Sequence, residues 1–433
     1  MEDLNRKFSF SEQIAIMLYK TSNKAVHYET YVLSQILAEF EYKYEYHQKT
    51  FEYSVRRHEN MRAYFKLNEN DTVEREYDEN YSPRALPLVT IKDEATPEIL
   101  DKIFFEFYDK NYSIEKLPGI KVLLVKATNG LFSLIRGHHC YLEVETAKIL
   151  HRESIYLYKK IYESQGQISY EDATKDLPPL PKFTEYIQEL HEDIKIKQPM
   201  ISDFLTTALK NYVDVDKANA PVVGFDYFYD KFRIDIKDSQ TEKFLKEYSI
   251  KPHHVFKALH QISISKILNT NIPLIFNVNS QRTEKWKNHY GCQAKNHPFY
   301  VEVDPERTFK EQIEYNDLKN REMLEVYGPL DAYMITAQGG KNFPVSQYVL
   351  NFVYNDESDI VFRPDLRKET KIETNYPMNI YFEIYYRTNE FFLAFYLSKI
   401  AAVSEEETLK MKNFLIETYN NLPNLWNTKI KNF

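Results

Sequence analysis

Two adjacent histidines, in the tetrapeptide Gly137-His138-His139-Cys140, are the residues best suited to move a proton. A neutral imidazole titrates at a pH of about 6.5, so it can accept or orient a proton near neutral pH. Zinc-binding helices carry histidines four positions apart on one face, whereas adjacent residues of a strand point to opposite faces. The spacing therefore argues against a zinc site, and we expect no metal ion bound by His138, His139 and Glu143.

Local patterns predict which elements position the histidines. Residues 121–136 hold two β-rich runs around Asn129-Gly130, a pair that supplies the positive φ angles of a tight hairpin turn. The second run, Leu131 to Arg136, ends directly before Gly137-His138-His139. Beyond Leu142, one helical face collects apolar side chains, namely Val144, Ala147, Leu150, Tyr158 and Ile161. The histidine pair is therefore predicted at a strand-to-helix junction, where side chains can face a cleft.

Length and composition indicate a globular protein of two domains. The chain has 433 residues, whereas single cores stop growing at about 250–300 residues. Its 43% hydrophobic and 28% charged content allows a substantial core. The formal net charge of −8 should repel polyanions, so we expect no nucleic-acid partner.

Several further features of the sequence predict the cellular compartment and argue against a nucleotide cofactor. Cys140 and Cys292 are the only cysteines, so no disulfide framework is expected. The acidic start Met1-Glu2-Asp3 predicts no signal peptide, and no uncharged apolar run approaches the length of about 18 residues that spans a bilayer. With nine glycines, the chain has no phosphate-binding loop motif. We therefore expect a cytoplasmic protein that binds neither a membrane nor a nucleotide.

A proline-rich segment predicts the boundary between the two domains. Leu177-Pro178-Pro179-Leu180-Pro181 cannot continue a helix and is typical of a linker. We place the boundary near residue 175, which gives domains 1–175 and 176–433. The second domain has its own strand and helix patterns, at residues 231–236, 252–268, 272–278, 348–354 and 380–386, and from Ser404.

Several motifs occur in a fixed order along the chain. Residues 138–144 (HHCYLEV) follow the pattern HHxxxDG in part. Residues 10–13 (FSEQ) look like an S-x-x-Q element, and residues 57–65 (RHENMRAYF) look like R-H-E-x-L-R-T-x-F. Later segments continue the series at residues 183–186, 281–282, 290–298, 348–354 and 379–396. The set resembles the condensation domains of nonribosomal peptide synthesis, a branch of the chloramphenicol-acetyltransferase-like acyltransferases. It covers almost the whole chain without an adenylation or carrier module, as in a stand-alone member.

The resemblance implies a fold and an activity. The fold would be α/β of the α+β type, with two chloramphenicol-acetyltransferase-like lobes in a V-shaped pseudo-dimer around a central tunnel. The first lobe would carry the HHxxxDG-like motif, with His139 acting on an amine as it attacks a thioester carbonyl. The donor would be the phosphopantetheine arm of an acyl or peptidyl carrier protein acting in trans. The acceptor would be a small amine, the chain a monomer, and no cofactor would be bound.

The resemblance also assigns supporting residues around the active histidine. His138 precedes it, and Glu143 and Arg282 take the places of an aspartate and an arginine that pair in the family and hold the histidine loop. Arginine suits a buried pair because it can bond both carboxylate oxygens. Glu143 is one methylene longer than aspartate, and Val144 and Gln281 replace glycines.

These departures leave alternatives open. The enzyme could form an ester with an alcohol or take acyl-coenzyme A as donor. It could also be a non-catalytic scaffold that binds a carrier protein. Taken singly, His138-His139 could be a chance pair, and Glu143 and Arg282 could be two unrelated solvated charges.

Overall fold

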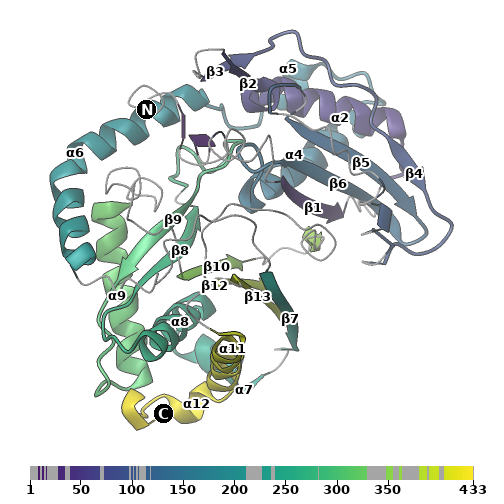
Figure 1. The fold of residues 1–433 in the computed structure, drawn as a ribbon. Coiled ribbons are helices and arrows are strands. Elements are labelled where there is room, and N and C mark those ends of the chain that lie inside the picture. The colour runs from purple at the N-terminus through teal and green to yellow at the C-terminus, as the bar shows by residue number, and fades with distance from the viewer. Residues whose placement is uncertain are drawn as a thin grey trace. The chain divides into compact units, whose positions relative to one another are not determined.

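The computed structural model forms two compact units (Figure 1). The first comprises Met1–His191, Arg282–Gln293 and Glu357–Thr370, and the second comprises Glu192–Gln281, Ala294–Asp356 and Lys371–Phe433. The structure describes residues 8–9, 12–13, 16, 28–34, 40–68, 73–96, 99–100, 102–103, 106, 114–117, 119–210, 227–235, 239–280, 282–328, 348–354, 360–362, 380–387, 390–398 and 404–432.

These bounds differ from the division at residue 175 that the proline-rich segment predicts. The long helix α6 (Phe183–Lys210) begins after the prolines, and its first residue is buried. The ring of Phe183 stacks on that of His289, with the centroids 5.1 Å apart. This packing keeps the first turns of α6 in the first unit, up to His191.

A mixed sheet of five described strands forms the centre of the first unit. Its order is β11-β1-β6-β5-β4, and its strands are β1 (Tyr28–Ser34), β4 (Leu88–Thr90), β5 (Ile120–Ala127), β6 (Gly130–His138) and β11 (Ile360–Phe362). Strands β5 and β6 form the predicted antiparallel hairpin, with Ala127 opposite Gly130. The sheet thus leads β6 directly to the histidine pair.

The turn of this hairpin lies one residue earlier than predicted. Thr128 and Asn129 form the loop, and Gly130 already pairs in β6 with a φ of 147°. The Asn129 side chain accepts a hydrogen bond from the Ala95 amide at 2.8 Å and donates to the Ala95 carbonyl at 3.3 Å. Asparagine thus secures a neighbouring segment, while glycine supplies the positive φ.

Helices α2 (Tyr44–Arg57) and α4 (Val144–Glu163) pack against each other in the first unit (Figure 1). In residues 40–58, Tyr44, His47, Phe51 and Val55 recur at three- and four-residue steps, which predicts a helix with one buried stripe. The burial of His47 and Val55 confirms it. The stripe predicted on α4 is confirmed by its buried members, Ala147, Leu150, Tyr158 and Ile161. Other elements of this unit are η2 (Glu59–Arg62), β2 (Ala63–Leu67), β3 (Val73–Tyr77) and α5 (Tyr170–Thr174).

The described residues of the second unit form a sheet of six strands in the order β7-β13-β12-β10-β8-β9. Its strands are β7 (Tyr227–Asp235), β8 (Leu274–Ser280), β9 (Ala294–Tyr300), β10 (Tyr348–Tyr354), β12 (Ile380–Arg387) and β13 (Glu390–Ser398). Strand β10 runs parallel to β8 and β12, and the other pairs are antiparallel. Helices α7 (Gln240–Glu247), α8 (Pro252–Leu268), α9 (Phe309–Tyr327) and α11 (Glu405–Asn420) contribute to its core, with α12 (Leu422–Leu425) and η4 (Ile430–Asn432) at the end.

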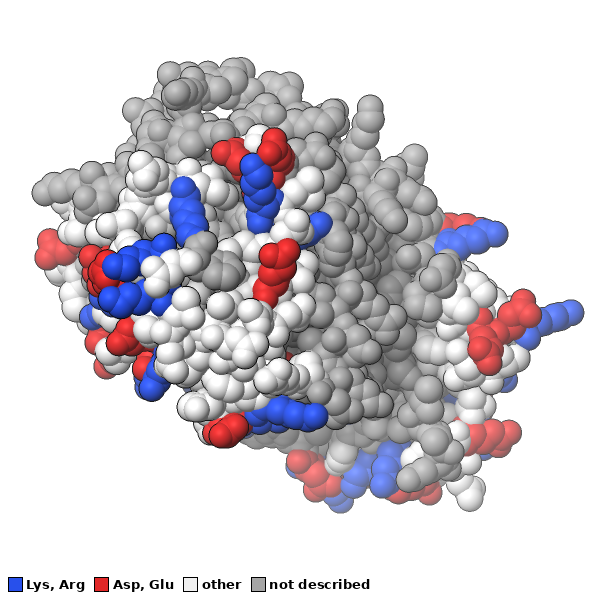
Figure 2. All heavy atoms as spheres, turned by 90° about the horizontal axis from the view of Figure 1, so that it is seen from below, with Lys and Arg blue, Asp and Glu red and all other residues white. Residues whose placement is uncertain are grey.

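Two properties of the described residues are their hydropathy along the helices and the charge on one face. Among the residues that the structure places, no helix is long and apolar enough to cross a bilayer. Acidic and basic side chains are interspersed on the face in Figure 2. Exposed side chains of opposite charge also pair, as Lys319 does with Glu322 and Lys429 with Glu306.

Candidate functional site

The histidine pair lies at the predicted strand-to-helix junction. Strand β6 ends at His138, and the amides of Tyr141 and Leu142 both donate to the His138 carbonyl, at 2.8 and 3.1 Å. This turn leads through Glu143 into α4. A tight turn between a strand and a helix therefore fixes the backbone of His139.

His139 is half-buried, and its ring is oriented by the backbone. Its Nδ1 lies 3.2 Å from the carbonyl oxygen of Leu142. A carbonyl oxygen can only accept, so Nδ1 carries the hydrogen, and Nε2 holds the lone pair of the neutral ring. Nε2 is thus the nitrogen that can accept a proton, and it lies 4.0 Å from the sulfur of Cys292.

His138 faces the interior and is fully buried. Its Nδ1 accepts a hydrogen bond from the Cys140 amide at 3.2 Å and lies 3.1 Å from the Cys140 sulfur. Burial raises the pKa of the Cys140 thiol well above its usual value, so this sulfur stays protonated and packs in the core. The two histidines consequently have different surroundings, and His139 is the more accessible ring.

Glu143 and Arg282 form a buried ion pair, so the alternative of two solvated charges is wrong. Their side chains are 5% and 6% exposed. Arg282 Nε donates to Glu143 Oε1 at 3.2 Å, and Nη2 donates to the same oxygen. The guanidinium also donates to the carbonyls of His289 at 2.6 Å and Gly291 at 2.7 Å. Arg282 thereby fixes the segment Arg282–Gln293 against the start of α4.

Both carboxylate oxygens of the longer Glu143 side chain have neighbours outside α4. Glu143 is the N-cap residue of α4, but its carboxylate makes no capping bond to the helix. Instead Oε1 accepts the Gln293 amide at 3.2 Å, and Oε2 lies 3.5 Å from the Cys292 sulfur. Val144, at a position where the resemblance implies a glycine, begins α4 in helical backbone that needs no glycine. Gln281 lies outside the described residues.

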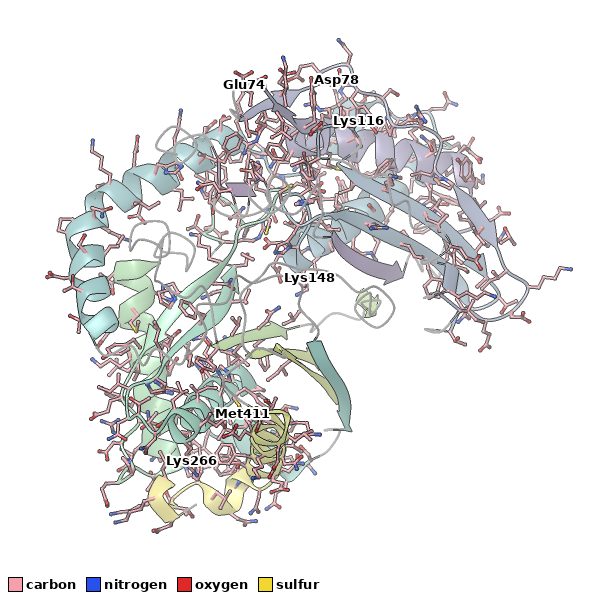
Figure 3. The ribbon with its side chains drawn as sticks, viewed as in Figure 1. Glu74, Asp78, Lys116, Lys148, Lys266 and Met411 are labelled. Atoms are coloured by element: carbon pink, nitrogen blue, oxygen red, sulfur yellow. The ribbon has the colours of Figure 1, made fainter. Side chains whose placement is uncertain are left out.

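A positive side chain stands one turn further along α4. Lys148, labelled in Figure 3, is largely buried, and its Nζ lies 2.9 Å from Glu145 Oε1. This pair joins adjacent turns of the helix.

Arg57 and His58, at the start of the 57–65 motif, attach α4, the helix that follows the histidine pair, to α2. Arg57 Nε and His58 Nε2 lie 3.1 and 2.7 Å from oxygens of Glu153, which belongs to α4. Burial alone would raise the pKa of Glu153, but the charges and hydrogen bonds of His58 and Arg57 outweigh it and lower the pKa. Arg57 and His58, which both bind the buried Glu153 carboxylate, thus fix α4 to the end of α2.

The next two residues of the same motif, Glu59 and Asn60, contact α6 and the Tyr290-Gly291 motif. Glu59 accepts a hydrogen bond from the Phe183 amide, and Asn60 Nδ2 donates to the Tyr290 carbonyl at 3.0 Å. Gly291 has a φ of 142°, and a Cβ there would lie 2.8 Å from Asn60 Nδ2. A glycine is therefore required at this position for both its backbone angle and its close neighbours.

The structure adds two residues that sequence reasoning missed. Arg75 of β3 forms a buried ion pair with Glu12, which lies in the S-x-x-Q element; Phe10 and Ser11 of that element lie outside the described residues. Cys292 contacts both His139 and Glu143. Arg75 stands in an ordinary alternating strand, and Cys292 had only its place beside Tyr290-Gly291 as a signal. Within the described part of the chain, no group of three His, Cys, Asp or Glu side chains could hold a metal ion.

Solved structures similar to this one identify the class of fold. The condensation domain of the Monacolin K polyketide synthase MokA matches with a TM-score of 0.75 at 11% identity, over 98% of each chain. The starter condensation domain of rhizomide synthetase RzmA, in complex with C8-CoA, matches with a TM-score of 0.74 at 10% identity, over 98% of this chain and 96% of that one. The epimerization domain of tyrocidine synthetase B matches with a TM-score of 0.69 at 12% identity, over 95% and 96%.

The chain therefore has the condensation-domain fold along nearly its whole length, as the motif series predicts. No protein-family model and no curated protein matches its sequence.

Proposed function

We propose that this protein is a stand-alone condensation enzyme, which transfers an acyl or aminoacyl group from a carrier-protein thioester to an amine. The observation that carries the proposal is His139: its Nδ1–H is held by the Leu142 carbonyl, so its Nε2 is the basic nitrogen. The condensation-domain fold supports the same reaction class. The Glu143–Arg282 pair, which secures the segment beside this ring, supports a site built for function.

In the proposed reaction, the amine nitrogen attacks the thioester carbonyl while His139 Nε2 accepts or orients the proton that the amine gives up. The new C–N bond forms the amide, the C–S bond breaks, and the pantetheine sulfur leaves as a thiol after taking a proton. No covalent intermediate with the enzyme is needed. The partners would be an acyl or peptidyl carrier protein in trans and a small amine, and the enzyme would act as a cytoplasmic monomer without a cofactor of its own.

The test uses defined donors because the natural carrier is unidentified. The purified full chain is incubated with acyl-pantetheine thioesters or acyl-coenzyme A and a panel of primary amines, and the products are identified by mass spectrometry. Turnover should fall by about 10²–10⁴-fold in His139→Ala. His254→Ala, on α8 of the second unit, removes a histidine whose ring pairs with Asp317, and this matched deletion should keep the wild-type rate. Undiminished amide formation by His139→Ala would eliminate the proposal.

Two other activities have specific support. The RzmA domain was solved with C8-CoA, which favours acyl-coenzyme A as a donor, and alcohols added to the same assay would reveal ester formation. The fold also occurs in an epimerization domain, so fold alone does not fix the reaction. A non-catalytic carrier-binding scaffold would bind a carrier protein but give no product with any donor.

A further inference from the structure

Cys292 stands between the candidate catalytic ring and the buried ion pair. It is fully buried and follows Gly291 in the segment that Arg282 holds. Its sulfur lies 4.0 Å from Nε2 of His139 and 3.5 Å from Oε2 of Glu143. The Cys292 amide also donates to the Cys140 carbonyl at 3.5 Å. Cys292 therefore contacts the backbone directly after the histidine pair as well.

The direction of the thiol hydrogen follows from its neighbours. An ionised carboxylate can only accept, so the S–H of Cys292 points to Glu143. The sulfur then presents lone pairs to the imidazole. When Nε2 takes up a proton, its N–H faces a sulfur acceptor whose own hydrogen is bound to a negative charge. In the neutral ring the same neighbours meet in van der Waals contact, with the sulfur 4.0 Å from Nε2. Both protonation states therefore favour the ring orientation in which Nδ1 donates to Leu142 and Nε2 faces Cys292.

We propose that Cys292 is a positioning residue for His139, holding the imidazole in one orientation by joining it to the Glu143–Arg282 pair. The inference deepens the proposed function and rests on it for its catalytic meaning. Glu143 and Arg282 therefore act on His139 through Cys292. Removal of the thiol lets the ring turn about its Cβ–Cγ bond, so that Nδ1 leaves the Leu142 carbonyl and the proton of the neutral ring can occupy either nitrogen.

Cys140 provides a matched control, because its thiol contacts His138 and not His139 in the contacts described above. Cys140 is also buried, and its sulfur lies 3.1 Å from Nδ1 of His138. Truncation of either cysteine to alanine deletes the same atom from a buried site. Each truncation should therefore affect a different imidazole.

The experiment reads the ring nitrogens directly and needs no substrate. The full chain is labelled with 15N-histidine, and the ring signals of His139 and His138 are assigned by their loss in His139→Gln and His138→Gln. At a pH of about 8, an ordinary imidazole is neutral. The wild type should then show a protonated Nδ1 and an unprotonated Nε2 at His139. Cys292→Ala should draw the two shifts toward an average, and Cys292→Ser, whose hydroxyl can donate to Glu143, should keep them apart.

Cys140→Ala should move the His138 signals and leave those of His139 in place. A folded Cys292→Ala protein with wild-type His139 shifts would overturn the inference. If Cys292→Ala does not fold, a folded Cys292→Ser protein with averaged His139 shifts would overturn it equally.

Activity measurements separate this inference from the proposed function. In the condensation assay, Cys292→Ala should lower kcat by about 10–100-fold, because a slightly misplaced catalytic group costs that much. KM should stay within about twofold, since the thiol is fully buried and so contributes little uniform substrate binding. A wild-type protein that shows the predicted ring signals but makes no product refutes the proposed function and leaves the ring orientation established.

Discussion

Glu143 and Arg282 are 139 positions apart in the sequence, and they meet in a buried ion pair of the first unit. Arg282 begins the short segment Arg282–Gln293, which belongs to that unit although the chain on both sides of it belongs to the second. The guanidinium donates to the Glu143 carboxylate and to three backbone carbonyls of this segment, those of Trp286, His289 and Gly291. The pair thus holds a returning segment beside the histidine turn.

Glu143→Ala should destabilise the protein, because it leaves the buried guanidinium of Arg282 without its carboxylate. The loss should be about 3–5 kcal/mol of unfolding free energy. Urea denaturation followed by circular dichroism measures it. Glu322→Ala removes a carboxylate from an exposed pair with Lys319 and should change the free energy by less than about 0.5 kcal/mol. Equal losses in the two variants would show that burial of the first pair is unimportant.

Gly291→Ala should destabilise the same region by a different route. A left-handed φ costs a residue with a Cβ about 1–3 kcal/mol, and the new Cβ would meet Asn60 Nδ2 at 2.8 Å. Asn60→Ala removes that neighbour, so the double variant should lose less stability than the sum of the two single variants. A thermal melting series on the four proteins measures this interaction. Strict additivity would mean that the contact is relieved elsewhere.

Glu153 should make stability depend on pH in the acid range. Its pKa is lowered in the folded protein, whereas in the unfolded chain it is about 4.3. The folded state therefore binds this proton less readily than the unfolded state. The stabilisation is fully present above the unfolded pKa and is lost as the pH falls through the folded pKa.

The measurement is urea denaturation at a series of pH values from neutral downward. Glu153→Gln, which cannot ionise, should flatten the acid limb of the stability curve. Glu171, whose pair with Arg56 is exposed, supplies the matched control Glu171→Gln, and this variant should keep the wild-type slope. An unchanged acid limb in Glu153→Gln would contradict the prediction.

Leu259→Ala should lower the free energy of unfolding, because α8 packs in the core of the second unit. Leu259 is fully buried in α8, and deleting its side chain should cost about 2–5 kcal/mol because a cavity remains. Leu318 on α9 is 47% exposed, so Leu318→Ala should cost much less. Differential scanning calorimetry of both variants compares them. Similar shifts in melting temperature would argue that α8 does not pack as described.

Local patterns were sufficient for much of the secondary structure. The hairpin before His138, the buried stripe of α2 and the buried stripe of α4 are confirmed. Each arises from residues a few positions apart, whose periodicity follows from strand and helix geometry. The turn at Thr128-Asn129 was displaced by one residue, because Asn129 is used to bind Ala95.

The order of motifs predicted the fold, and the similar solved structures confirm it. It also predicted the Glu143–Arg282 pair, since the resemblance supplied a contact that spacing alone does not encode. The sequence by itself therefore determined the elements, the class of fold and the identity of the candidate ring at His139.

Tertiary structure alone decided how that ring is surrounded. Cys292 reaches His139 across 153 positions, and Arg75 reaches Glu12 from an ordinary strand. Neither contact leaves a periodic trace, because each depends on where distant segments return in space. The return of Arg282–Gln293 to the first unit results from many packing and hydrogen-bonding contacts acting together, and no local run of residues specifies such a sum.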